Sequence, residues 1–214
     1  MKYLMIICFA SIAFGFNIQY NEASRRVSYP PAFKILKFDK TEKTFKDSVQ
    51  GKLVDGLSWQ DAAGEHRVLF TAKAVEMNKE GRQNAFIYAY CFSKQTNGWK
   101  KKWEVKDRIT DCEVDATCEF FRGSFTVTDK NANDIGEVCF LYKLSCKGDV
   151  SPDEKKLIMY EGVNKYAIRG STILQFPESK EGGDKKIDAS FSKAHKALLD
   201  FANRQWDKFG IAKY

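Results

Sequence analysis

The chain has few of the residues on which metal proteins and divided, multi-domain chains depend. Its 214 residues include two histidines and four prolines, and no two cysteines stand in a C-x-x-C arrangement. These shortages argue against a zinc site, which takes four nitrogen or sulfur ligands. With so little proline and no glycine- or serine-rich stretch, no linker divides the chain. We therefore expect one domain with a real hydrophobic core.

Sequence motifs of the common hydrolases and nucleotide-binding enzymes are also missing. The chain contains no G-x-S-x-G, no H-E-x-x-H and no P-loop. One catalytic hypothesis remains, a carboxylate-dependent hydrolase acting on glycan or other cell-envelope material. Its acid and base would be Asp61 with Glu65, or Asp149 with Asp153, if the fold brings two carboxylates to the required separation. Turn and capping positions explain Asp61 and Asp149 without chemistry, so we favour a non-catalytic protein and keep the hydrolase as the alternative.

A membrane-spanning run is absent, although the chain begins with apolar residues. Lys2 precedes an apolar stretch over residues 3–15 that ends in small residues, which is the layout of a secretory signal peptide. An uncleaved anchor is the alternative, but the stretch falls short of the roughly 20 residues that a spanning helix needs. We expect cleavage after Gly15, a mature domain over residues 16–214, no later transmembrane span, and a periplasmic or secreted location.

Five cysteines follow the signal peptide. An oxidising compartment allows disulfides, and an odd number leaves at least one cysteine without a partner in the same chain. Cys112 and Cys118 flank an acidic loop and form the predicted pair, with Cys112–Cys146 as the alternative. Cys91 and Cys139 lie inside apolar runs, so we predict that they are buried free thiols.

Positive charge is scattered along the chain, with a net charge of +7. The densest run, Lys100 to Lys102, stands between Trp99 and Trp103, a pattern that can contact polyanions. A strand with lysines on its solvent face explains the same pattern, and export removes most nucleic-acid partners. We therefore predict no nucleic-acid partner, and an envelope, glycan or protein ligand instead.

Strand patterns follow one another through most of the chain. Tight turns at 78–81, 96–98 and 162–164 predict hairpins. We expect a mainly β fold, an antiparallel meander or sandwich, with two propeller-blade-like units as a variant; a closed propeller needs more residues than the chain has. The predicted strands, about nine in number, lie at 33–38, 52–57, 67–75, 85–92, 99–105, 124–128, 138–144, 157–160 and 166–168.

Only the end of the chain has a helical pattern. From Asp188, which can cap a helix, apolar residues recur at helical spacing as far as Phe209, and Gly210 then stops the pattern. This predicts one amphipathic helix at about 188–209 that packs on a sheet. We expect His195 to be a packing residue at the edge of the apolar stripe rather than a ligand.

Two segments share a weak repeat. Residues 61–70 align with residues 133–142, and each gives a polar turn, a glycine (Gly64 or Gly136), an acidic residue and an apolar strand. The glycines are predicted to take positive φ. The repeat indicates two similar β units, each beginning one sheet or half-domain.

The most distinctive motif is the D-x-N-x-N-x-x-G-E loop at residues 129–137. Calcium prefers six to eight oxygen ligands on a flexible turn, and alternate spacing directs side-chain oxygens inward. An Asn- and Asp-rich turn that needs left-handed backbone explains the same residues without a metal. With only two carboxylates, a site would be weak, with a Kd of roughly 10⁻⁴ to 10⁻³ M. The predicted calcium ligands are Asp129, Asn131, Asn133, the Ile135 carbonyl and Glu137.

This loop resembles the calcium loops of FG-GAP repeats, which occur in integrin α-type propellers and in many secreted bacterial proteins. Asp134 stands where that repeat usually has glycine, and Glu137 replaces the usual aspartate. With motifs at 58–65, 146–152 and 165–170, the chain resembles a group of uncharacterised exported bacterial proteins over about residues 50–175. The resemblance implies an envelope or secreted location and no known activity. The sequence thus predicts a non-catalytic exported protein, a calcium-stabilised binding module.

Overall fold

The computed structural model describes residues 32–40, 44–45 and 47–214. Pro31–Tyr214 belong to one compact unit. The predicted signal peptide and its cleavage site lie outside the described residues, so both stay predictions.

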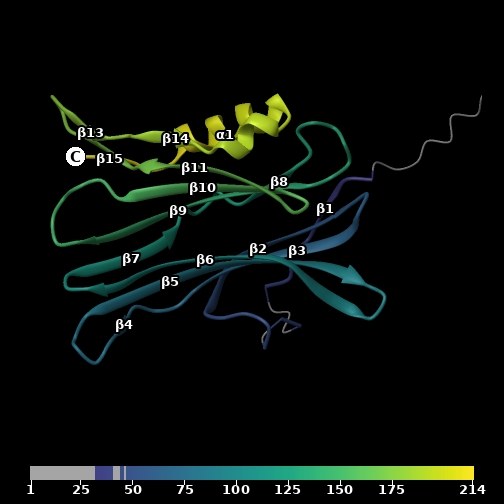
Figure 1. The fold of residues 1–214 in the computed structure, drawn as a ribbon, viewed down its shortest axis with the longest axis horizontal. Helices are drawn as coiled ribbons and strands as arrows, with labels where there is room; N and C mark the ends of the chain where they lie inside the picture. Colours follow the sequence, from purple (N-terminus) through teal and green to yellow (C-terminus); the bar gives the residue numbers. More distant parts are fainter. Residues whose placement is uncertain (1–31, 41–43, 46) are drawn as a thin grey trace, which may run out of the picture. The chain divides into compact units, whose positions relative to one another are not determined.

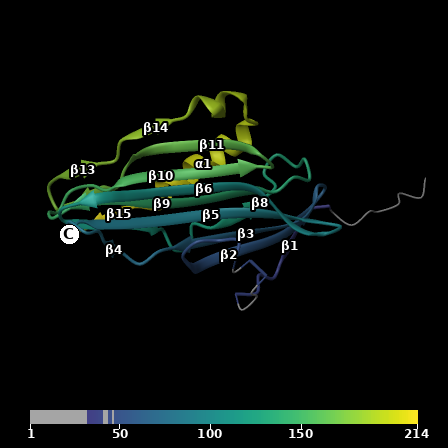
Figure 2. The ribbon, with the colours of Figure 1, turned by 60° about the horizontal axis from the view of Figure 1, so that its bottom comes forward.

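Two antiparallel sheets pack face to face (Figure 1). In sheet A the order is β1-β2-β3-β5-β4, with β6 also paired to β5, and these strands lie side by side in Figure 2. In sheet B the order is β14-β11-β10-β9-β7, with β8 also paired to β9. Sheet A contains β1 (Lys34–Leu36), β2 (Lys52–Asp61), β3 (Gly64–Ala72), β4 (Glu76–Met77), β5 (Gln83–Gln95) and β6 (Gly98–Cys112). Sheet B contains β7 (Asp115–Phe120), β8 (Thr126–Thr128), β9 (Glu137–Lys147), β10 (Glu154–Glu161), β11 (Asn164–Ser171) and β14 (Lys185–Ile187).

A small third sheet, sheet C, lies near the end of the chain. It consists of β12 (Ile173–Gln175), β13 (Lys180–Gly182) and β15 (Ile211–Lys213), and β12 pairs with β15 in parallel. The predicted mainly β, antiparallel sandwich is confirmed, and no closed barrel forms among the described residues. Each of the nine predicted runs overlaps a strand. The strands that sequence patterns missed are short, between two and six residues each.

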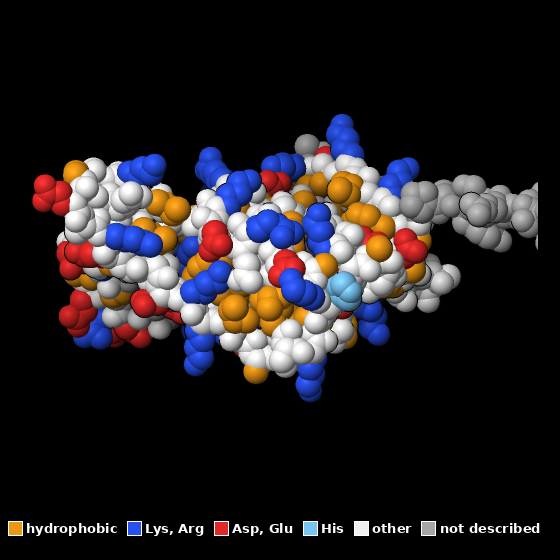
Figure 3. Space-filling view, turned by 90° about the horizontal axis from the view of Figure 1, so that it is seen from above, with side chains coloured by type: hydrophobic (Ala, Val, Ile, Leu, Met, Phe, Trp, Pro, Cys, Tyr) orange, Lys and Arg blue, Asp and Glu red, His pale blue; other side chains and the backbone are white. Residues whose placement is uncertain are grey.

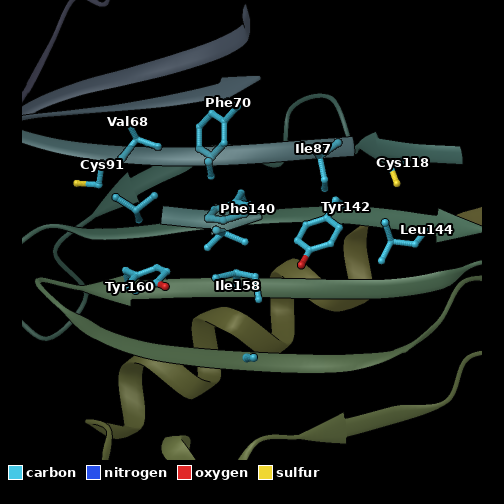
Figure 4. Packing of buried hydrophobic residues seen from close by; sticks show 14 of the residues in the cluster. Val68, Phe70, Ile87, Cys91, Cys118, Phe140, Tyr142, Leu144, Ile158 and Tyr160 are labelled. Atoms are coloured by element: carbon cyan, nitrogen blue, oxygen red, sulfur yellow. The ribbon is translucent and has the colours of Figure 1, made fainter. Parts of the chain in front are cut away.

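Apolar side chains on both faces of sheet B explain its central position. Phe140 on β9 and Ile158 on β10 point toward sheet A, where Phe70 meets them in the core between the sheets (Figure 4). Leu141 and Met159 point to the opposite face and are also fully buried. A strand buried on both faces reads as a continuous apolar run, which is the pattern that β9 and β10 show.

The helix α1 (Lys196–Lys208) covers the outer face of sheet B (Figure 1). The predicted helix at 188–209 is divided, because a 3₁₀ helix over Ala189–Lys193 precedes α1 and the two residues between them are extended. Asp188 caps the 3₁₀ helix, and the His195 side chain accepts the Ala197 N–H and caps α1. The packing role predicted for His195 was therefore wrong, since its ring satisfies a free N–H at the first turn of α1. Gly210, at φ +79°, follows the helix as predicted.

Lys155 joins the end of α1 to sheet B. Its side chain is almost fully buried, and Nζ donates to the carbonyls of Trp206 at 2.8 Å and Phe209 at 2.6 Å. The ammonium also lies 4.2 Å from the centre of the Trp206 ring. Free carbonyls and the negative end of the helix dipole favour a cation at this position. Burial nevertheless lowers the pKa of Lys155 to about 8.

The disulfide joins the two sheets. Cys112 at the end of β6 is bonded to Cys146 on β9, so the predicted Cys112–Cys118 pair was wrong and the alternative is correct. The pairing of β7 with β9 explains this, because it sets Ala116 opposite Cys146 and carries Cys118 two residues further along. The Cys118 thiol donates to the Ala85 carbonyl instead. Cys91, Cys118 and Cys139 are buried free thiols, as predicted for the first and the last.

Candidate functional site

The predicted calcium ligands lie together in one loop, but most of their oxygens accept hydrogen bonds from the loop itself. Asp129 accepts the backbone N–H groups of Asn133 at 3.1 Å and Asp134 at 3.0 Å. Asn133 Oδ1 accepts the N–H of Ile135 at 2.9 Å. Asp134 has φ +61° and so takes the left-handed conformation for which glycine is usual. The turn interpretation therefore accounts for Asp129, Asn133 and Asp134.

Glu137 is fully buried and faces the start of the same loop. Its carboxylate accepts the N–H of Lys130 at 2.9 Å and the hydroxyl of Thr128 at 2.9 Å. Burial raises the pKa of Glu137, and these hydrogen bonds partly offset that effect. Such contacts fix the base of the loop and leave the carboxylate without access to solvent.

A carboxylate from another hairpin closes the loop. Glu161, at the end of β10, accepts from the side-chain amides of Asn131 at 2.7 Å and Asn133 at 2.9 Å. The Asn131 oxygen is buried and has no hydrogen-bond partner among the described residues. In the part of the chain that the structure describes, no group of three His, Cys, Asp or Glu residues is placed to hold a metal ion. Calcium binding stays a prediction.

Asp61 connects this loop to sheet A. One carboxylate oxygen accepts Trp59 Nε1 at 2.9 Å and the Gly136 N–H at 3.0 Å, and the other lies 2.9 Å from His66 Nε2. The Ala63 N–H also donates to it at 2.8 Å. Burial opposes ionisation of Asp61, but the hydrogen bonds outweigh burial and lower its pKa to about 2. Asp61 is thus an ionised, fully occupied acceptor in the interior.

Positive φ was predicted for the glycine of each repeat segment, and this is correct for one of the two. Gly64 has φ +113°, as predicted, whereas Gly136 does not have positive φ. Gly136 is needed for a different reason, because a Cβ there would lie 2.4 Å from Trp59 Nε1. The two repeat segments lie in different sheets and contact each other through Asp61.

The carboxylates of the first hydrolase pair do not share a cavity. Asp61 lines a small cavity of about 40 Å³ with His66 and Cys91, and Glu65 is not among its lining residues. Glu65 instead pairs with Lys94 at 2.8 Å on the surface. A cavity of this size has room for water rather than for a substrate.

The second pair does share a cleft. Asp149 and Asp153 both line an open cleft of about 430 Å³ beside sheet C, together with Lys143 and Lys147. Asp153 is paired with Lys147 at 2.5 Å and with Lys143 at 3.2 Å. Burial raises the pKa of Asp153, but the two lysines outweigh burial and lower it. A general acid needs the opposite shift, so Asp153 is not tuned for that role.

Two further hollows continue from that cleft. A hollow of about 430 Å³ between the sheets shares Phe121 and Lys143 with the cleft, and a third hollow of about 480 Å³ shares Val54 and Arg122 with the second. We call the three together the β7 groove, since they follow β7 and the turn after it. No prediction from the sequence located this groove, although the Phe-Arg-Gly-Ser turn at 121–124 was a signal of an exposed cation after a strand.

The tryptophans of the described residues do not line up as a surface on which a glycan could stack. Trp59 is buried, and Trp99 packs against Arg67 and Phe45. Trp103 stacks on Tyr160 at 4.0 Å between the sheets, so it is not free to stack on a base. Lys100 to Lys102 are exposed on β6, in agreement with a strand that has lysines on its solvent face. Figure 3 likewise shows Lys and Arg scattered over one face among Asp and Glu.

Comparison with known proteins found no match for this chain among protein-family models, curated proteins or solved structures. None of the described helices has the length and apolar character needed to cross a lipid bilayer. Function must therefore be inferred from the site itself.

Proposed function

We propose that this protein is a non-catalytic, exported binding module and that its ligand lies along the β7 groove. The single observation that carries the proposal is that three neighbouring hollows share lining residues and follow one another beside β7 and the turn after it. Each hollow has a volume in the range of small-molecule sites, and the lining mixes apolar side chains with a few charges. The rigid two-sheet framework behind it suits a binding role.

The states of the acidic residues support binding over hydrolysis. Asp61 and Asp153 have lowered pKa values and are occupied by internal donors, so neither is placed to deliver a proton. The alternative, a hydrolase acting on glycan, keeps one supporting observation, which is that Asp149 and Asp153 line the same cleft. Export is supported by the disulfide between the sheets, which an oxidising compartment favours.

We also propose that loop 129–137 binds calcium weakly as a structural ion. The buried Asn131 oxygen without a partner supports this proposal, and the Asp129 carboxylate of the same loop is the kind of oxygen ligand that calcium takes. An ion there would hold the loop that Asp61 attaches to sheet A.

The binding proposal is tested by screening the purified protein against panels of envelope glycans, peptides and amphipathic acids, with mass spectrometry of each ligand before and after incubation. We expect at least one ligand to bind and to keep its mass. Val54→Trp, which fills the rim of the groove, should weaken binding, whereas Val163→Trp in the exposed β10–β11 turn should not. A ligand that is cleaved, with loss of cleavage in Asp153→Asn, would establish the hydrolase instead.

A further inference from the structure

We propose that the hollow between the sheets binds a monocarboxylate with an apolar body, such as a fatty acid, and that Arg122 binds the carboxylate. This inference rests on the proposed binding function and names the class of ligand for the middle part of the β7 groove. Four observations support it: the apolar side chains that line the hollow, the fixed backbone of the turn that carries Arg122, the absence of an ion pair between Arg122 and the described residues, and the pairing of the neighbouring cations with acidic residues.

Apolar side chains from both sheets line the hollow. Val54 and Ala72 come from sheet A, and Cys118, Phe120 and Phe121 come from β7 and the turn that follows it. Three charged residues complete the lining: Arg122, and Glu119 with its partner Lys143. Val54 is 39% exposed, which is unusual for a valine beside a core and leaves apolar surface open to a ligand. Burial of an alkyl chain against this surface would tighten binding with each CH₂ group that leaves water.

A rigid turn presents Arg122 at the edge of this surface. The Ser124 N–H donates to the Phe121 carbonyl at 3.1 Å, and Gly123 between them has φ +79°. The buried Ser124 hydroxyl donates to the Leu141 carbonyl at 3.3 Å and accepts the Leu141 N–H at 3.0 Å. The Ser124 side chain thus makes the two hydrogen bonds to Leu141 that a neighbouring strand would otherwise make, and these bonds hold the turn against β9. Because the backbone of the turn is fixed, a ligand that binds Arg122 does not have to order this part of the main chain.

Arg122 is exposed and makes no ion pair with any of the described residues. It lines both the hollow between the sheets and the next one. A guanidinium donates two parallel hydrogen bonds to a carboxylate, which gives direction as well as strength. An uncompensated arginine beside apolar surface is therefore complementary to a single carboxylate on an apolar body.

The other cations along the groove are already compensated. Lys143 lies 3.2 Å from Asp153 and 3.7 Å from Glu119. Lys147 lies 2.5 Å from Asp153, and Lys40 lies 2.9 Å from Asp55. A polyanion or a strongly acidic peptide would have to displace these acidic partners, whereas a monocarboxylate needs only Arg122. Among the described cations that line the groove, Arg122 alone lacks an acidic partner, so the groove suits a ligand with one negative charge.

Isothermal titration calorimetry with decanoate, below its micelle-forming concentration, tests the proposal, with decan-1-ol as the uncharged comparison. We expect decanoate to bind one per chain and decanol to bind at least about tenfold more weakly, because it lacks the charge-assisted hydrogen bonds. Arg122→Gln should weaken decanoate about tenfold without changing decanol. Arg82→Gln is the matched control, since Arg82 is exposed and paired with Glu113 away from the groove.

Three results would overturn the proposal: equal affinity for acid and alcohol, an unchanged affinity in Arg122→Gln, or no decanoate binding up to millimolar concentration. Val54→Trp provides a second variant that does not touch the charge and should weaken both compounds. If decanoate fails while a glycan or peptide from the panels binds along the groove, the ligand class is wrong and the binding function stands. If nothing binds in either experiment, both are wrong.

Discussion

The carboxylate of Asp61 accepts the backbone N–H of Gly136 at 3.0 Å, although the two residues are 75 positions apart. Close to the same point, the Ala62 N–H donates to the Asp134 carbonyl at 2.8 Å. These bonds hold loop 129–137 against the β2–β3 hairpin and so fasten sheet B to sheet A at one end. The disulfide between Cys112 and Cys146 provides a second, covalent link between the sheets.

Replacement of Asp61 by alanine should lower the free energy of unfolding by about 3 kcal/mol or more. The change leaves the buried donors of Trp59 and Gly136 without an acceptor and removes the charge beside His66. Urea denaturation measures the effect. Asp149→Ala is the control, since Asp149 is exposed and should change stability by less than about 0.5 kcal/mol. A loss below about 1 kcal/mol for Asp61→Ala would show that Asp61 does not hold the loop.

The stability of the protein should depend on Lys155 at alkaline pH. Its folded pKa is lowered to about 8 from an ordinary value near 10.5, so the unfolded chain binds more protons between these two values. The penalty for a buried charge is full below pH 8 and is relieved as the pH rises toward 10.5. Relative to Lys155→Met, the wild type should therefore gain stability over this interval, by about 3 kcal/mol at most.

Urea denaturation of both proteins at several pH values between 7 and 10.5 checks this difference. Titrating groups other than Lys155 are common to both proteins, so their contribution cancels in the comparison. Parallel stability curves for wild type and Lys155→Met would contradict a penalty at Lys155.

Calcium should stabilise the protein through loop 129–137. For a Kd of roughly 10⁻³ M, calcium at about 5 mM would add about 1 kcal/mol and raise the melting temperature by roughly 2 to 4 °C. Asp129→Ala should abolish the rise, while Asp149→Ala, in a loop outside residues 129–137, should keep it. Thermal unfolding with calcium or with chelator provides the measurement, and an unchanged melting temperature in the wild type would leave only the hydrogen-bonded turn.

Loss of the disulfide should destabilise the fold by about 4 kcal/mol in the chain-entropy account, because it closes a loop across a sequence separation of 34. The variant with alanine at both Cys112 and Cys146 tests this by urea denaturation. Cys118→Ala is the control, since Cys118 forms no disulfide. Peptide mapping without reduction should recover the fragment that joins Cys112 to Cys146, and a Cys112–Cys118 fragment would contradict the structure.

Much of the sheet architecture was predictable, because the strands of the core alternate or run continuously apolar. β7 was missed, since its sequence Asp-Ala-Thr-Cys-Glu-Phe mixes polar and apolar residues and follows a turn. Because β7 was missed, the disulfide partner of Cys112 was also predicted wrongly. The pairing of Cys112 depends on the β7–β9 register, which places Cys118 out of reach, and no local pattern contains this register.

The candidate site was harder to predict for the same reason. The loop at 129–137 was recognisable from its own residues, but its partners Asp61 and Glu161 come from distant hairpins. Gly136 seemed to be a turn glycine, whereas the fold requires it because Trp59 approaches from another sheet. The β7 groove depends on how β2, β7 and the 121–124 turn come together, and this is tertiary structure rather than sequence pattern.

The most direct test of the central claim is a map of backbone amide chemical shifts while the best ligand from the screening panels is added. The account predicts that the changes follow the β7 groove, at Phe121, Arg122, Lys143 and Tyr214, and that the ligand is recovered intact. Changes confined to the surroundings of Asp61 and His66, or a ligand recovered as cleavage products, would contradict it.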